Sequence, residues 1–323
     1  MVPSPSSRLR SWLLPLDPQY RERVWGGQHL RPGTLPVGEA WVGYGGSVVG
    51  GGPHAGRTLD ELAASTPSDL LGQGVVARSG ERVPLLVKLL DCADWLSVQV
   101  HPNDEQAAEL VGPGELGKTE AWHFLETEAG AEIIVGVVPG TSAAQLEAAI
   151  RGGRVLELSE RRPVQAGDTA FIPAGTLHAL GPGMLLYEVQ QASDTTYRVY
   201  DWDRPVSAGR RLHLDESVAV TDPAAGGELR PVGETGGLGE LVRSDYFVLE
   251  GLAVGEPGTA GDTAGESLHL LTVTSGELEL GCGDERLRLT RFDTALVAGG
   301  AGAYRMRGLG GEARLLRASV PPG

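Results

Sequence analysis

The sequence predicts an all-β dominated protein, built as two barrels with a few short helices. Its 323 residues include 48 glycines and 21 prolines, as expected when turns join many short strands. Most of its apolar stretches are about four to eight residues long, which is the usual length of a strand. A turn pattern at residues 167–175 recurs at residues 291–300, so the two parts of the chain are expected to share one architecture.

Three helices are predicted from the residues that would begin them. Thr58 and Ser142 are each followed three residues later by Glu or Gln, a capping-box pattern that precedes a helix. Gly152 and the glycine after it then end the second of these helices. Asn103 is expected to cap a third, short helix over residues 104–110.

Strands are predicted for most of the remaining chain. In order they cover residues 83–90, 96–101, 132–138, 170–172, 184–189, 246–254, 267–274, 277–281, 285–290 and 312–317. Residues 1–37 form an arm punctuated by Pro and Gly, residues 223–239 form a connection, and residues 255–266 are loop-rich. The predicted domains are residues 1–228, with the arm and helical insertions, and residues 229–323.

Composition restricts the partners and the compartment. The formal net charge of −15 argues against a nucleic acid or an anionic membrane as partner. A phosphorylated substrate stays compatible, because a few cations in a pocket outweigh a diffuse charge that salt screens. The two cysteines imply no disulfide framework, and Pro15 interrupts the short apolar run near the start. These features predict a soluble protein of the cytoplasm.

The segment Leu96–His101 is the first candidate for chemistry. Its alternation places Gln99 and His101 on one face of a strand and the apolar residues on the other. A polar face of this kind either meets water or lines a cavity, and this segment by itself is compatible with both.

Two further segments favour a metal site. Lys118, Glu120 and Trp122 share a face of a second predicted strand. Residues 167–178 have the pattern G-D-x4-P-x-G-x2-H, in which a strand enters a Pro-Gly turn that directs His178 towards the mouth of a barrel. This pattern is typical of cupin barrels. Two histidines, a carboxylate and an amide oxygen suit Zn²⁺ with one open position. The other histidines are expected to be structural or at the surface: His29, His54, His123, His213 and His269.

The recurring turn predicts a second barrel without a metal. Residues 291–300 align with residues 167–175 so that Asp293 matches Asp168. In this register Ala303 takes the position of His178, and alanine cannot ligate a metal. The fold class predicted is therefore two cupin barrels (jelly-roll, RmlC-like), the first metal-binding and catalytic and the second metal-free.

Six short sequence segments are more specific than the general cupin pattern. They are VWGG at 24–27, GEAW at 38–41, LSVQVHPND at 96–104, GELGKTEAW at 114–122, PAGTLH at 173–178 and QQASDTTYRVYDWDR at 190–204. With these strings the sequence resembles class I mannose-6-phosphate isomerases of the short bacterial form, over about residues 20–215.

The resemblance implies a set of site residues. One Zn²⁺ per chain would be held by Gln99, His101, Glu120 and His178. Arg198 would be an active-site residue. The positions that match the sugar-phosphate pocket of the family are Lys118, Glu188, Asp194, Arg204 and Trp25.

Plainer interpretations of three of these residues stay open at this point. Arg198 can pair with Asp194 or Asp201 on a surface loop, where such pairs contribute little to stability. Lys118 can serve only as the partner of a metal-bound carboxylate. Trp25 can belong to the core.

The implied activity is the reversible isomerisation of mannose 6-phosphate and fructose 6-phosphate through a zinc-stabilised cis-enediolate. The chain would act as a monomer or homodimer, and the group that takes the carbon-bound proton is open between Glu188, Lys118 and a hydroxide on the metal. Three alternatives are another cupin phosphosugar isomerase, an iron cupin oxygenase and a sugar-binding cupin without catalysis. The oxygenase is disfavoured because such sites gather three histidines, and the QVHP string supplies one where two are expected.

Overall fold

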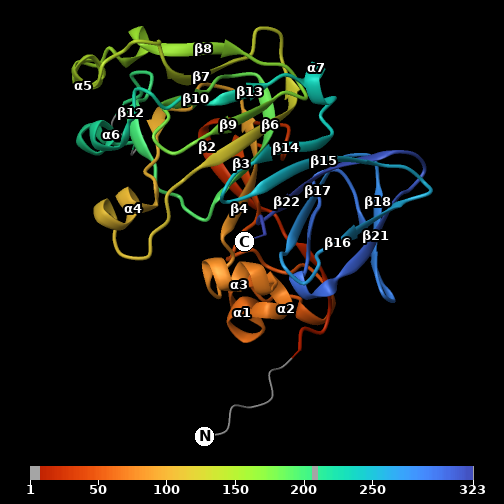
Figure 1. Cartoon of the computed structure of the whole chain (residues 1–323). Helices are drawn as coiled ribbons and strands as arrows, with labels where there is room; N and C mark the ends of the chain where they lie inside the picture. The colour runs from red at the N-terminus through yellow and green to blue at the C-terminus, as the bar shows by residue number, and fades with distance from the viewer. Residues whose placement is uncertain (1–7, 206–209, 323) are drawn as a thin grey trace, which may run out of the picture. The chain divides into compact units, whose positions relative to one another are not determined.

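Antiparallel strands form two compact units, each with two sheets. The computed structural model describes residues 8–205 and 210–322, and Figure 1 labels its helices and strands. The central unit comprises residues 20–39 and 89–236, and the C-terminal unit comprises the described residues of 1–19, 40–88 and 237–323. The all-β dominated class is confirmed.

The central unit contains a five-stranded sheet and most of a seven-stranded sheet. The first has the order β12 (Tyr197–Tyr200), β5 (Val98–Val100), β10 (His178–Leu180), β7 (Glu132–Val137), β8 (Ser159–Pro163). The second has the order β13 (Glu228–Arg230), β9 (Thr169–Ile172), β6 (Glu120–Thr127), β11 (Met184–Gln191), β4 (Leu85–Cys92), β2 (Gln19–Gly27), β3 (Val37–Gly43). Trp122, Phe124 and Ile133 belong to the buried apolar cluster of this unit. The chain crosses from one unit to the other within β3 and β4.

The C-terminal unit is built in the same way from a six-stranded and a four-stranded sheet. The larger sheet has the order β1 (Leu13–Leu16), β20 (Thr294–Val297), β17 (His269–Ser275), β22 (Ala313–Ser319), β15 (Val248–Val254), β14 (Gly239–Arg243). The smaller has the order β16 (Thr259–Asp262), β21 (Ala303–Gly308), β18 (Leu278–Cys282), β19 (Glu285–Leu289). Side chains from both sheets, such as Leu271 and Leu280, form one apolar core.

The three predicted helices are confirmed with their capping boxes. They are α1 (Leu59–Ser65), α4 (Asp104–Leu110) and α5 (Ala143–Arg151). Four helices were not predicted: α2 (Pro67–Leu71), α3 (Gln73–Ser79), α6 (Leu214–Val220) and α7 (Val232–Thr235). None of the four has a side-chain cap at its start, so the signal used for the others is missing. Among the described residues, no helix combines the length and the apolar character needed to cross a bilayer.

The segments predicted as irregular contain strands that pair far along the chain. The arm at residues 1–37 contributes β1, which runs antiparallel to β20 from Leu13–Val297 to Leu16–Thr294. The connection at 223–239 contains β13 and α7, and the loop-rich segment at 255–266 contains β16. Because of the β1–β20 pairing, the C-terminal unit is discontinuous, whereas the predicted division at residues 228/229 treats each domain as one segment.

Candidate metal centre

Three predicted site residues form one row across the five-stranded sheet. On β12, β5 and β10, Arg198 is the cross-strand partner of Gln99, and Gln99 is the partner of His178. Directly opposed residues of antiparallel strands point to the same face of a sheet. The pairing register therefore brings together side chains from distant parts of the chain, since Gln99 and His178 are 79 residues apart in the sequence.

His101, Glu120 and His178 meet in the interior of the central unit. Their ligand atoms all lie within 4.8 Å of one another. The Nε2 atoms of the two histidines are 3.1 Å apart, and the Glu120 oxygens lie 3.6 Å from His101 Nε2 and 3.3 Å from His178 Nε2. All three side chains are at most 1% exposed.

Backbone carbonyls orient both imidazole rings. Nδ1 of His101 lies 2.9 Å from the carbonyl oxygen of Thr195, and Nδ1 of His178 lies 2.8 Å from that of Thr176. A carbonyl only accepts, so each Nδ1 carries the proton and each Nε2 presents a lone pair to its neighbour. Burial lowers the pKa of His178, which favours the neutral ring that a metal requires. The facing lone pairs and the carboxylate fit a divalent cation between them.

Lys118 places its own cation against this group. Its Nζ lies 2.9 Å from Oε2 of Glu120 and 2.9 Å from Nε2 of His101, and the side chain is 4% exposed. The structure thus shows the ion pair with Glu120 that was one interpretation of Lys118. An ammonium drawn to two candidate ligand atoms indicates a strong preference of this position for positive charge.

Gln99 adjoins the same cluster through its amide. The amide nitrogen lies 3.2 Å from Nε2 of His178, and Oε1 accepts a hydrogen bond of 3.4 Å from Ser97 Oγ. Rotating the amide by half a turn exchanges its nitrogen and oxygen with little change in shape. Gln99 can therefore present an oxygen to a cation at this place.

Arg198 is half-buried beside this centre. Its Nε donates to Oγ of Ser97 at 3.2 Å and its Nη1 to the carbonyl of Arg211 at 3.0 Å. Burial, and secondarily the neighbouring charge of Arg210, lower the pKa of Arg198. Within the described part of the chain, Arg198 makes no ion pair with Asp194 or Asp201, so the plain surface pairing is not what the structure shows.

The other predicted pocket residues differ in their surroundings. Glu188 is buried and accepts a hydrogen bond of 3.2 Å from Trp122 Nε1. Trp25 lies 3% exposed in the apolar core, in agreement with the interpretation as packing. Arg204 is held in ion pairs with Asp94 at 2.8 Å and Asp201 at 3.0 Å. Asp194 is exposed on the loop before β12.

The loop that carries Lys118 is fixed by a buried amide. Gln191 accepts a hydrogen bond from the Thr119 amide at 2.9 Å and donates to Oδ1 of Asp104 at 2.9 Å. The same Asp104 oxygen accepts from the Gly117 amide at 2.7 Å. These contacts join the end of β11 to the start of α4, so the position of Lys118 is determined from both sides.

Sequence reasoning missed several parts of the site. Ser97 contacts both Gln99 and Arg198. His213 accepts a hydrogen bond of 3.2 Å from the Arg198 backbone amide, a contact compatible with the structural role expected for it. The carbonyls of Thr176 and Thr195 have no signature in a sequence, because every residue has a carbonyl. Ser97 did carry a signal, since it shares a strand face with Gln99.

Comparisons with known proteins place the chain among phosphomannose isomerases. The family model "Phosphomannose isomerase type I, catalytic domain" matches residues 13–139. The chain is 37% identical over 305 residues to "Mannose-6-phosphate isomerase ManA" of Bacillus subtilis (strain 168), covering 90% of this chain and 94% of the relative. A crystal structure of the mannose 6-phosphate isomerase from Bacillus subtilis has a TM-score of 0.82 at 30% identity, covering 95% of this chain and 99% of that one.

A second similar structure bears on the fold. It is described as a mannose 6-phosphate isomerase (holo; zinc bound), with a TM-score of 0.74 at 18% identity, and the match covers 95% of this chain and 99% of that chain. The predicted cupin fold class is confirmed by these neighbours. From the extent and identity of the match to the curated relative, the chain belongs to the type I phosphomannose isomerase family.

Proposed function

We propose that the protein is a mannose-6-phosphate isomerase, which interconverts mannose 6-phosphate and fructose 6-phosphate. The observation that carries the proposal is the row of Arg198, Gln99 and His178 beside the converging His101 and Glu120. Such a row places a permanent cation next to a candidate metal centre. Family membership supplies the substrate class.

The proposed metal is one Zn²⁺ per chain, held by Gln99, His101, Glu120 and His178. Two imidazoles, a carboxylate and an amide oxygen form a donor set that zinc accepts readily. When bound, the ion polarises the substrate carbonyl and offsets the negative charge of the enediolate. The name of the zinc-bound structural relative supports the choice of metal.

The chain's own residues supply the remaining steps. Arg198, half-buried and held by Ser97 and the Arg211 carbonyl, is placed to stabilise the enediolate oxygens with a fixed pair of N–H donors. Lys118 forms an ion pair with Glu120 in this structure, and its ammonium would be available to the sugar phosphate if Glu120 held a divalent ion instead. Asp194, Arg204 and Trp25 remain proposed pocket residues. For Arg204 this role requires it to leave one of its two ion pairs.

The proton on carbon must move between C1 and C2, and two buried side chains are proposed for this transfer. Glu188 is oriented by Trp122, and Lys118 lies at the metal ligands. Replacing each in turn, with Glu188→Gln and Lys118→Met, distinguishes them. The true base is the one whose loss abolishes exchange of the substrate's C2 proton with solvent.

A coupled assay tests the proposal. Metal-loaded protein with mannose 6-phosphate should form fructose 6-phosphate, a chelator should abolish the activity, and added Zn²⁺ should restore it. The same assay with other aldose phosphates tests the related possibility of another phosphosugar isomerase. Absence of turnover of mannose 6-phosphate by the zinc-loaded protein contradicts the proposal. We further propose a cytoplasmic monomer or homodimer, which gel filtration coupled to light scattering checks.

A further inference from the structure

The outer face of the four-stranded sheet in the C-terminal unit carries a row of basic residues with no carboxylate. Arg286 on β19 and Arg305 on β21 are both cross-strand partners of Gly281 on β18. Both arginines are exposed, and together with Gly281 they line a cavity of about 470 Å³, whose lining also includes Glu279 and Arg307 of the next row. In a chain of net charge −15, two arginines in such an arrangement call for an explanation.

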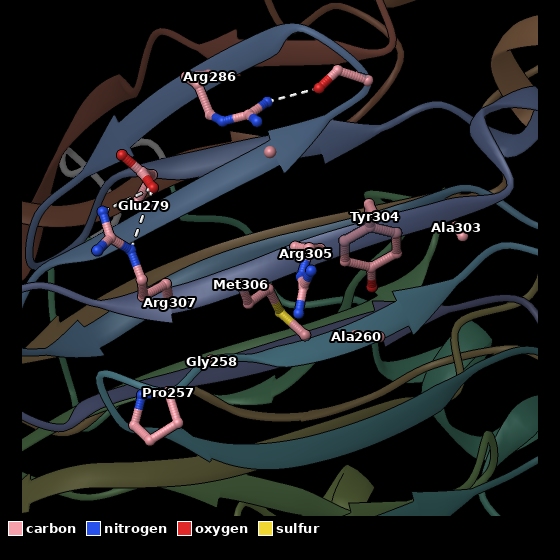
Figure 2. Close-up of a pocket in the computed structure, with 12 residues that line it drawn as sticks. Pro257, Gly258, Ala260, Glu279, Arg286, Ala303, Tyr304, Arg305, Met306 and Arg307 are labelled. Carbon is pink, nitrogen blue, oxygen red and sulfur yellow. Dashed lines mark hydrogen bonds and ion pairs between the residues drawn. The ribbon is translucent and has the colours of Figure 1, made fainter.

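Neither arginine has an acidic partner in the described structure. Arg286 folds back on its own hairpin, where Nη1 donates to the carbonyls of Gly283 and Glu285 at 2.7 Å each. The side chain of Arg305 makes no hydrogen bond or ion pair with any described residue. Figure 2 shows Arg286 held to the hairpin, and Arg305 on β21, which is separated from the Arg286 strand by β18.

The next row of the same sheet provides an internal comparison. There Glu279 lies between Arg307 and Arg288 in the same register that Gly281 occupies between Arg305 and Arg286. Arg307 pairs with the Glu279 carboxylate, at 2.9 Å from Nη2 and 3.2 Å from Nε, as the dashed lines in Figure 2 show. The protein therefore fills one of the two rows with its own anion and leaves the other without one.

The space in the unfilled row suits a compact anion. Gly281 has no side chain, and a Cβ at this position would meet atoms of the Arg286 side chain at 3.3 Å, so the guanidinium lies directly over the glycine. Ala260, the partner of Arg305 on β16, is also small. Adjacent strands are about 4.8 Å apart, so the two arginines begin about 10 Å apart, and their side chains can close on a group between them.

We propose that this row, Arg286–Gly281–Arg305, binds a phosphate group, either free phosphate or that of a small phosphate monoester. Guanidinium groups donate pairs of hydrogen bonds that match the oxygens of phosphate. A phosphate held between the Arg286 and Arg305 guanidinium groups would serve them as the Glu279 carboxylate serves Arg307 one row away. The site lies wholly in the C-terminal unit and does not depend on the function proposed for the central unit.

Titration with inorganic phosphate, followed by NMR of the labelled metal-loaded protein, tests the proposal. We expect saturable shifts of the Gly281 amide, of the amides of residues 303–307 and of the Arg305 side-chain Nε–H. Arg305→Gln should weaken this binding by about tenfold or more, because one charged pair of donors is lost. Gly281→Glu should abolish it, because the new carboxylate occupies the site. Signals near Gln99 and Arg198 report the catalytic centre separately.

The matched control is Arg314→Gln, at an exposed arginine of β22 that pairs with Glu312. It should leave phosphate binding unchanged. The proposal is overturned if no shift at Gly281 saturates by tens of millimolar phosphate, or if Arg305→Gln and the control behave alike, as general screening by ions would produce. An alkyl phosphate monoester then assigns the source: tighter binding than phosphate indicates a phosphorylated metabolite, and weaker binding indicates free phosphate.

Discussion

Each unit holds a cluster of polar side chains, fully buried in the central unit and partly buried in the C-terminal unit, and the two clusters differ in which groups satisfy their acceptors. In the C-terminal unit, Arg317 donates to Glu250 at 2.7 and 2.8 Å and to the Tyr304 hydroxyl at 3.3 Å. That hydroxyl lies 2.8 Å from Nδ1 of His269, to which it can donate. Each acceptor in this series of hydrogen bonds faces a donor of the protein itself, so nothing further is needed for burial.

The central unit instead gathers acceptors. The two Nε2 atoms of His101 and His178 face one another at 3.1 Å beside the Glu120 carboxylate, with Lys118 as the nearest cation. Lys118 Nζ and the Gln99 amide nitrogen are the donors that these acceptors face, and two facing lone pairs beside a carboxylate are costly to bury unless a cation lies close to them. The difference indicates that the central unit is the better candidate for binding a metal, because acceptors predominate in its polar interior.

The turns that precede these clusters show that the two units share backbone geometry. Asp168 accepts from the amide three residues earlier at 3.0 Å, and Asp293 does the same at 2.7 Å. The preceding residue has a positive φ in both, 90° at Gly167 and 72° at Phe292. Ten residues after each aspartate, β10 begins with His178 and β21 begins with Ala303. At this position the two units therefore differ by one side chain: His178 is a candidate metal ligand, and Ala303 cannot be one.

The largest effect is expected from removing that ligand. His178→Ala should lose the metal, and the activity should fall by more than about 100-fold, beyond the loss typical of a residue that only orients a ligand. The matched variant His269→Ala removes a buried histidine of the C-terminal cluster and should keep the metal. Metal analysis and the coupled assay measure both. Retention of stoichiometric metal by His178→Ala and His101→Ala would refute the ligand assignment.

The second largest effect is expected from replacing Arg198, which should lower turnover and leave the metal content unchanged. Arg198→Lys keeps the charge but loses the planar pair of donors, and we expect kcat to fall by about 100-fold, as when one charge-stabilising donor is removed. A role confined to gripping the phosphate would raise KM and leave kcat unchanged. The counterpart Arg317→Lys should lower stability while the folded fraction keeps its kcat. Normal kcat of Arg198→Ala at saturating substrate would rule out the proposed role.

The two turn aspartates should have similar effects on stability and different effects on function. Asp168→Ala and Asp293→Ala each remove hydrogen bonds to a carboxylate and should lower the free energy of unfolding by about 1.5–3 kcal/mol. Asp168→Ala should also weaken metal binding, because it loosens the turn that leads to His178. Urea unfolding and metal titration measure these effects. A large fall in kcat for well-folded Asp293→Ala would show that the C-terminal unit contributes to catalysis.

The smallest effect concerns pH. Burial lowers the pKa of His269 to about 3, against 6.5 for the exposed side chain, so the unfolded chain binds the proton first as pH falls. The free energy of unfolding should therefore decrease from about pH 6.5 downwards, by about 2 kcal/mol at pH 5 from this residue. His269→Gln should remove that part of the pH dependence. The pKa of His123 in the central unit is lowered to about 4 by burial, so a remaining slope is expected. An unchanged slope in His269→Gln would contradict the assignment.

Local sequence determined the features that short-range chemistry controls. The capping boxes at Thr58 and Ser142 and the cap at Asn103 predicted three helices correctly, because a cap acts within the first turn of its helix. Alternation predicted that Gln99 and His101 lie on one face, and in the structure β5 covers Val98–Val100 with His101 directly after it. The turn pattern singled out His178, at which β10 begins, although no strand was predicted there. Helices without a side-chain cap, such as α2, were not predicted. The strand β1 was not predicted either, because it forms by pairing with the distant strand β20.

Tertiary structure alone decided how these parts meet. The row of Arg198, Gln99 and His178 exists because β12, β5 and β10 pair in one register, and a shift by one residue would turn each side chain to the other face. The proton positions on His101 and His178 follow from the carbonyls of Thr195 and Thr176, which no residue type specifies. The sequence by itself determined which donor atoms the chain carries and on which strand faces they lie. Long-range strand pairing decided their distances, because contacts between distant segments depend on the whole folded core.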